Sequence, residues 1–216
     1  MNHELDTHGA LTLPNLLTRS QAAEMQRLVL DAIAGSRDGS GVTVFFPDQL
    51  PTPVLDLVVA GALGRAVRTA LGPCEFLSLK PVVKDAERSF ATPWHQDRPY
   101  WGGCAKWSLW LALDDVGPAE GCLRVVPGSH QRVSEHQTHD GSGRGFAHRL
   151  PEPDPAEIRD LPLRGGDAVL FHDLLWHASH PAAPGRQRVA LIPTYRPLGA
   201  VDSSTVWDRA LPVEAA

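Results

Sequence analysis

The stretch Trp94-His95-Gln96-Asp97 lies among short apolar runs, and His177 follows near the end of the same strand-rich half. Residues two apart on a strand point to the same side, so His95 and Asp97 are predicted to face inward while Gln96 faces away. Two imidazoles and one carboxylate can occupy one face of an octahedral metal ion and leave the other face open, as in non-haem Fe(II) sites. An H-x-D motif alone is common by chance, but His177 is well placed to supply the third ligand.

The surrounding sequence predicts the fold class. From Phe76 onward, Gly, Pro and Asp separate short segments that are apolar or alternate between apolar and polar residues. This pattern is typical of a β-sandwich or β-barrel. The predicted strands span residues 76–83, 106–113, 122–126, 168–171 and 188–195.

Helices are predicted before this region. Thr18-Arg19-Ser20-Gln21 has the form of a capping box, and the helix that it starts is expected to end near Ile33. A second helical pattern runs from Val54 to Leu71 and closes at Gly72-Pro73. We therefore expect one domain over residues 1–216, with a helical part at about 18–72 and a β core at about 76–197.

The bulk properties exclude several classes of partner. The 216 residues carry a formal net charge of -5 and no basic block, which argues against nucleic acid and anionic membranes. No apolar run is long enough to span a bilayer, and the polar segment 1–9 lacks the apolar region of a signal peptide. The three cysteines form no disulfide framework, so we expect a cytoplasmic protein with reduced thiols. Oligomeric state is not readable from the sequence.

Further motifs accompany the His-x-Asp segment in a definite order. They are Tyr100-Trp101, Gly121-Cys122-Leu123-Arg124-Val125-Val126-Pro127-Gly128-Ser129-His130, Gly166-Asp167-Ala168-Val169-Leu170-Phe171-His172, His177-Ala178-Ser179 and Arg188. In order and spacing the chain resembles the phytanoyl-CoA dioxygenase family of Fe(II)/2-oxoglutarate oxygenases over about residues 79–197, and more loosely over 9–17. The resemblance implies a mainly β fold with flanking helices, a double-stranded β-helix or cupin-like jelly roll.

The resemblance also implies roles for individual residues. Fe(II) would be held by His95, Asp97 and His177, and 2-oxoglutarate and O2 would be the cosubstrates. Arg188 would bind the far carboxylate of 2-oxoglutarate, because a planar guanidinium offers a bidentate match that Lys cannot reproduce. Arg186 is its competitor, but it lies in a predicted turn. Further cosubstrate-binding candidates are Ser179, Trp110 and Lys80, although Trp110 equally suits ordinary core packing.

Substrate-contacting candidates flank the metal motif. Aromatic side chains near a reactive metal centre can wall a pocket and exclude water, so Tyr100 and Trp101 are expected there. Arg196, and Trp207 beyond it, are further candidates near the C-terminus. His172 is a weaker candidate on the strand before His177, and the remaining histidines are expected to be structural or solvated.

The segment 134–162 is polar, rich in Gly, Pro and His, and has no clear period. We interpret it as a candidate lid over the barrel mouth. The alternative is a solvated loop without a role.

The expected function follows from the implied site. We expect a hydroxylase that oxidises an unactivated C–H bond of a small molecule, such as a natural-product intermediate, with release of succinate and CO2. Because Asp97 keeps the carboxylate that related halogenases lack, oxygenation is expected and not halogenation. The alternatives are a cupin-type isomerase or hydrolase that needs no 2-oxoglutarate, and a non-catalytic binding module.

Overall fold

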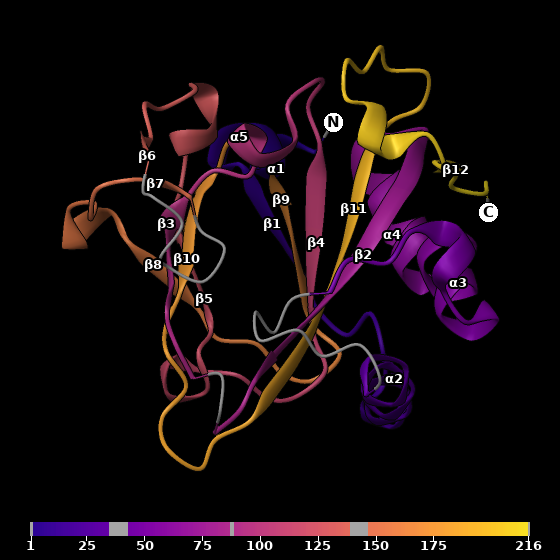
Figure 1. Cartoon of the computed structure of the whole chain (residues 1–216), viewed down its shortest axis with the longest axis horizontal. Helices are drawn as coiled ribbons and strands as arrows, with labels where there is room; N and C mark the ends of the chain where they lie inside the picture. Colours follow the sequence, from indigo (N-terminus) through magenta and orange to yellow (C-terminus); the bar gives the residue numbers. More distant parts are fainter. Residues whose placement is uncertain (1, 35–42, 87–88, 139–146, 216) are drawn as a thin grey trace.

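The computed structural model describes residues 2–34, 43–86, 89–138 and 147–215. Two antiparallel sheets face each other (Figure 1). The large sheet has six strands in the order β1 (Ala10–Leu13), β9 (Ala168–His172), β4 (Trp107–Ala112), β11 (Arg188–Pro197), β2 (Cys74–Lys84) and β12 (Leu211–Pro212). The small sheet has the order β3 (Thr92–His95), β10 (Trp176–Ser179), β5 (Leu123–Val126) and β8 (Arg159–Leu161). The predicted jelly roll is confirmed.

Helices cover the outer face of the large sheet. In Figure 1, α3 (Thr52–Val59) and α4 (Ala62–Leu71) lie beside β2, and α2 (Arg19–Ile33) lies below them. The capping box at Thr18 is confirmed: its hydroxyl accepts from the Gln21 N–H at 3.3 Å, and the Gln21 side chain accepts from the Thr18 N–H at 2.9 Å. The remaining helices are α1 (His3–His8), which the sequence did not predict, and the short α5 (Arg98–Trp101). Among the described residues, no helix is long and apolar enough to cross a bilayer.

The single helix predicted over 54–71 is wrong in one respect, because the structure divides it into α3 and α4. Gly61 takes an extended conformation and caps α4, and its N–H donates to the Asp56 carbonyl. A Cβ at Gly61 would lie 2.7 Å from the Leu57 Cα atom, so only glycine permits this tight corner. The apolar spacing on both sides fits a helix, which is why the pattern did not reveal the break.

Strand alternation divides the core into two layers. On β4, Leu109 and Leu111 pack toward the helices, whereas Trp110 and Ala112 belong to the apolar cluster between the sheets. Strand β11 alternates in the same way, so Ala190 and its inward-facing neighbours lie between the sheets. The inner layer therefore contains every second side chain of the large sheet, and the functional cavity lies there.

The proposed lid contains regular structure where the chain is described. Residues 139–146 of the segment 134–162 lie outside the described residues. Strands β6 (Gln137–Thr138) and β7 (His148–Arg149) pair with each other, and β8 forms the fourth strand of the small sheet beside β5. The sequence did not indicate β8, because its three residues are too few and too exposed to show a hydrophobic period.

Candidate active site

A cavity of about 560 Å³ lies between the two sheets. Both sheets line it, the small one through β3 and β10 and the large one mainly through β2, β4 and β11. Its wall is largely apolar, and its polar groups gather at two places. We refer to these as the metal end, around His95, Asp97 and His177, and the cationic end, around Lys84, Ser179 and Arg188.

Three candidate ligand atoms converge at the metal end. His95 and His177 are paired residues of β3 and β10, and their ring centroids lie 4.1 Å apart. The Asp97 Oδ1 atom lies 3.6 Å from the Nε2 atom of His95 and 3.8 Å from that of His177. All three ligand atoms lie within 4.8 Å of one another and are buried, so the group can hold a metal ion.

Backbone carbonyls orient both imidazoles. The Nδ1 atom of His95 lies 2.8 Å from the Pro93 carbonyl oxygen, and the Nδ1 atom of His177 lies 2.9 Å from the Leu175 carbonyl oxygen. A carbonyl only accepts, so each Nδ1 carries a hydrogen, and Nε2 is the ring atom that a metal would bind. Burial lowers the pKa of His177 to about 3, and His95 acts in the same direction, so this imidazole is neutral as a ligand must be.

Asp97 reaches the metal end by a different route from the one predicted. Strand β3 ends at His95, and Asp97 has helical backbone angles, φ -76° and ψ -30°, at the start of α5. The N–H groups of Asp97 and Arg98 donate to the Asp173 carbonyl at 2.8 and 3.2 Å, which fixes this turn. Strand alternation was therefore the wrong reason for the inward carboxylate. Gln96 does face away, donating to the Arg132 and Leu174 carbonyls.

The Asp97 carboxylate is held in its ionised form. Burial by itself would raise its pKa, but Lys80, His177 and His95 together hold the pKa well below its usual value. Ser108 also donates a long hydrogen bond, 3.4 Å, to its Oδ2 atom. A buried anion beside the imidazole nitrogens of His95 and His177 is a donor set suited to a divalent cation.

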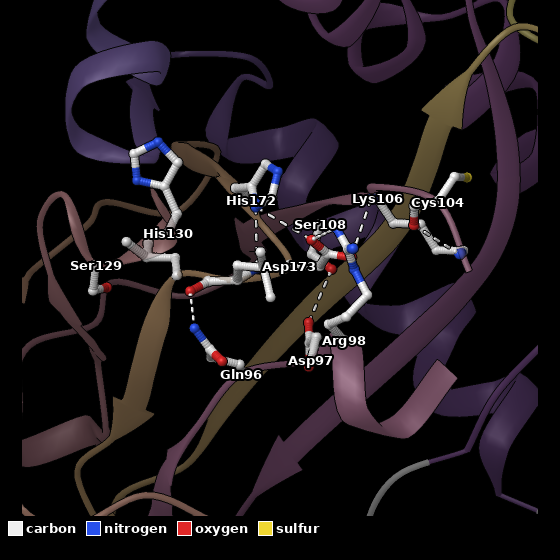
Figure 2. A network of polar contacts seen from close by, with 12 residues as sticks. Gln96, Asp97, Arg98, Cys104, Lys106, Ser108, Ser129, His130, His172 and Asp173 are labelled. Atoms are coloured by element: carbon white, nitrogen blue, oxygen red, sulfur yellow. Dashed lines mark hydrogen bonds and ion pairs between the residues drawn. The ribbon is translucent and has the colours of Figure 1, made fainter. Parts of the chain in front are cut away.

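A second buried carboxylate, which sequence reasoning missed, supports this turn (Figure 2). Asp173 is fully buried, and its oxygens accept from Arg98 Nε at 2.6 Å and Arg98 Nη2 at 2.9 Å. The same carboxylate accepts from the Trp101 indole and the Lys106 N–H, each at 3.2 Å. Its side chain and its carbonyl thus hold both ends of α5. His172 lies beside Asp173 and does not line the cavity, so it is not brought to the site.

Arg188 lies at the cationic end and is 2% exposed. Its Nη2 atom donates to the Gly121 carbonyl at 3.0 Å, while Nε and Nη1 are buried and have no hydrogen-bond partner in the described structure. The buried hydroxyl of Ser179 also has none there, and the Trp110 ring centroid lies 5.0 Å from the guanidinium. Buried donors normally have acceptors, so these groups fit a bound carboxylate such as that of 2-oxoglutarate. The competitor Arg186 is exposed and pairs with Glu120 at 3.5 Å.

The phytanoyl-CoA dioxygenase (PhyH) family matches residues 5–190. This chain belongs to that family. Among curated relatives, L-proline trans-4-hydroxylase of Streptomyces griseoviridis is 30% identical over 156 residues, which cover 62% of this chain and 58% of the relative. The 1-deoxypentalenic acid 11-beta-hydroxylase of Streptomyces arenae is 32% identical over 103 residues, 44% of this chain and 36% of the relative. The chain thus spans less than two thirds of the length of these relatives.

Solved structures share the fold of this PhyH-family chain. The non-heme monooxygenase ThoJ superposes with a TM-score of 0.79 at 24% identity, covering 99% of this chain and 83% of ThoJ. The epimerase SnoN, in complex with Fe3+, alpha ketoglutarate and nogalamycin RO, gives a TM-score of 0.76 at 19% identity, covering 98% and 96%. At these identities the likeness concerns the fold alone.

The cavity of this family member has an aromatic mouth. Tyr100 and Trp101 both line it, as expected, and the Tyr100 ring meets His95 edge-on at 6.0 Å between centroids. Lys80 also lines the cavity, with its Nζ atom 5.0 Å from the Trp101 ring centroid. Trp207 contributes a further wall and contacts Trp101.

The structure does not bring Arg196 to the cavity. Its guanidinium pairs with Glu75 at 2.7 Å and with Asp202 at 3.2 Å, and it is not a lining residue. The expectation that Arg196 contacts substrate is therefore not supported. Its partners come from β2 and the segment after β11, a pairing that the sequence does not reveal.

Sequence reasoning also missed several lining residues. They include Ser78, Lys84, Phe90 and Thr92. Alternation along β2 was an available signal, because Ser78 and Lys84 share the strand face of Lys80. The strand reads as a mostly apolar run, however, and such a run does not indicate which of its two faces is the cavity.

Proposed function

We propose that this chain is an Fe(II)- and 2-oxoglutarate-dependent oxygenase that hydroxylates an unactivated C–H bond of a small molecule, with release of succinate and CO2. One observation carries the proposal: a His-His-carboxylate set shares a cavity with a buried arginine whose Nε and Nη1 atoms have no hydrogen-bond acceptor among the described residues. A metal-dependent hydrolase with the same three ligands would give the buried Arg188 no role. Family membership and hydroxylases among the relatives support the same reaction class.

The residues divide the work between the two ends of the cavity. His95, Asp97 and His177 would hold Fe(II) on one face and leave the other open. Arg188 and Ser179 would bind the distal carboxylate of 2-oxoglutarate and so fix the direction in which its keto acid reaches the metal. When bound, the iron and its cosubstrates supply the oxidising chemistry. The protein positions the cosubstrate, supplies the charged groups that bind it and excludes water from the cavity.

The cavity wall favours a largely apolar substrate. Val44, Phe46, Trp101, Val206 and Trp207 are among its apolar lining residues, and Lys80 also lines it. Apolar walls exclude water and bind hydrocarbon surface, and few polar groups are left to fix orientation. A natural-product intermediate fits this wall. Epimerase and carbocyclase neighbours share the fold, so the outcome of oxidation depends on how the substrate is presented.

The test is an anaerobic titration of metal-free protein with Fe(II) and then 2-oxoglutarate, monitored by the visible charge-transfer band of the chelate. A band that requires both components supports the proposal and justifies screening substrates by succinate release. Bound iron without a band would favour a metalloenzyme independent of 2-oxoglutarate. Failure to bind iron would favour a non-catalytic binding module. Chlorinated product would contradict the oxygenation expected from Asp97.

A further inference from the structure

The cationic end holds a second buried cation, Lys84. Lys84 and Arg188 are paired residues of β2 and β11, and each is 2% exposed. Both line the same cavity. Gly121 lies between their side chains: its carbonyl accepts from Arg188, and a Cβ there would lie 2.9 Å from Lys84 Cδ. Two basic side chains therefore share one enclosed end.

Neither cation has an anionic partner within the described residues. Lys84 Nζ donates to the carbonyls of Phe90 at 2.7 Å and His180 at 2.5 Å, and Arg188 donates to that of Gly121. No ion pair joins either side chain to a described Asp or Glu. Lys106 shows the ordinary arrangement, since this buried ammonium pairs with buried Asp202 at 2.9 Å. Because buried charges are normally paired, the missing anion at the cationic end points to a ligand.

The charged and titratable groups around Lys84 disfavour its ammonium form in the free protein. Burial lowers the pKa of Lys84 to about 7, and the charge of Arg188 acts in the same direction. Cys122 opposes this weakly, but burial raises the pKa of that thiol to about 11 and keeps it neutral. The charge of Asp114 raises the pKa of Arg188, but this carboxylate already accepts hydrogen bonds from Gln26 and from the Val189 N–H. His180 contributes only its carbonyl to Lys84.

We propose that Lys84 is a second anchor for the distal carboxylate of 2-oxoglutarate, and that it takes up one proton when this cosubstrate binds. The inference rests on the proposed function. The carboxylate binds as an anion, the neutral amine of Lys84 gains a proton from solvent, and no bond within the cosubstrate changes. Above about pH 7 the free protein holds Lys84 deprotonated, so affinity for 2-oxoglutarate falls as pH rises, approaching about tenfold per pH unit.

Calorimetry tests this coupling directly. Fe(II)-loaded protein is titrated anaerobically with 2-oxoglutarate in buffers of different ionisation enthalpy, at pH 8 and at pH 6. We expect uptake of about 0.9 proton at pH 8 and about 0.1 at pH 6, from a group that titrates near 7. The matched ligand 2-oxopentanoate, in which a methyl group replaces the distal carboxylate, should bind without this uptake. Equal proton uptake with the two ligands would overturn the proposal.

Variants separate anchoring from a structural role. Lys84→Met should abolish the uptake and weaken 2-oxoglutarate binding at pH 6 about 10- to 100-fold, while leaving 2-oxopentanoate binding unchanged. A merely structural lysine would weaken both ligands alike. Lys84→Arg should bind 2-oxoglutarate without uptake, because arginine stays charged. Arg186→Met, at an exposed turn, should behave as wild type in both respects.

The outcomes separate the inference from the function on which it rests. If 2-oxoglutarate binds to wild type with no proton uptake at pH 8, or if Lys84→Met retains the uptake, the role of Lys84 is wrong and the proposed function stands. If wild-type protein loaded with Fe(II) does not bind 2-oxoglutarate, the proposed function itself is wrong.

Discussion

The two ends of the cavity satisfy their polar groups in opposite ways. At the metal end, the protein supplies the partners: carbonyls orient His95 and His177, and Asp173 fixes the turn that carries Asp97. At the cationic end, the buried Nε and Nη1 atoms of Arg188 have no acceptor among the residues that the structure describes. The small sheet supplies the two imidazoles, and the large sheet supplies the lysine and the arginine. One end is therefore organised before any ligand binds, whereas the other end leaves buried donors that a bound carboxylate would satisfy.

The largest effect is expected from removing a ligand at the metal end. Asp97→Ala or His177→Ala should reduce turnover to background, because two remaining donors cannot hold the open metal face. The fold should persist, which circular dichroism can check beside the metal content. His3→Ala, an exposed histidine of α1, is the control. Unchanged turnover in either ligand variant would remove the assignment of the metal centre.

The next effect concerns the support of the metal end. Asp173→Ala should lower the free energy of unfolding by about 3 kcal/mol, because Arg98 and two further donors lose a buried acceptor. Fe(II) affinity should fall about 10- to 100-fold, as for other groups that orient metal ligands. Urea unfolding and metal titration measure the two quantities.

Asp48→Ala is the matched control for Asp173→Ala. It breaks an exposed ion pair with Arg209 and should leave the free energy of unfolding close to that of wild type, because solvent screens such a pair. Loss of stability in Asp173→Ala without any loss of metal affinity would show that the metal end does not depend on this support.

A more selective effect is expected at the cationic end. Arg188→Ala should weaken 2-oxoglutarate binding by about 2–4 kcal/mol, or roughly 30- to 1000-fold, because a charge-assisted bidentate pair is lost. Fe(II) affinity should not change, since the metal end keeps its own partners. The amplitude of the charge-transfer band against cosubstrate concentration measures this. A larger loss in Arg186→Ala would mean that the wrong arginine was chosen.

The smallest effect tests whether both ends are insulated from the helical layer. Thr18→Ala removes the capping box of α2 and should lower the free energy of unfolding by about 1 kcal/mol. Affinities for Fe(II) and 2-oxoglutarate should equal those of wild type. A change in either affinity would show that ligand binding in the cavity depends on the helical layer as well as on the groups at its two ends.

Much of the fold was predictable because it depends on local pattern. The strands corresponding to β2, β4, β5, β9 and β11 and the cap at Thr18 follow from apolar spacing and turn residues within short windows. The division of the helix at Gly61 did not follow, because apolar spacing continues across it. Strand β8 was missed because three residues, two of them exposed, carry too little pattern.

The sequence by itself determined the family, the fold and the residue types that meet at the metal end, because their order and spacing are written along the chain. Only the tertiary structure decided which of those groups have partners. It placed the Asp173 carbonyl against the Asp97 turn, brought Arg196 to Glu75, and set Lys84 beside Arg188 with no anion from the described residues between them. These facts depend on burial and on pairing between distant strands. A linear pattern records neither, and the charge balance of the cavity follows from both.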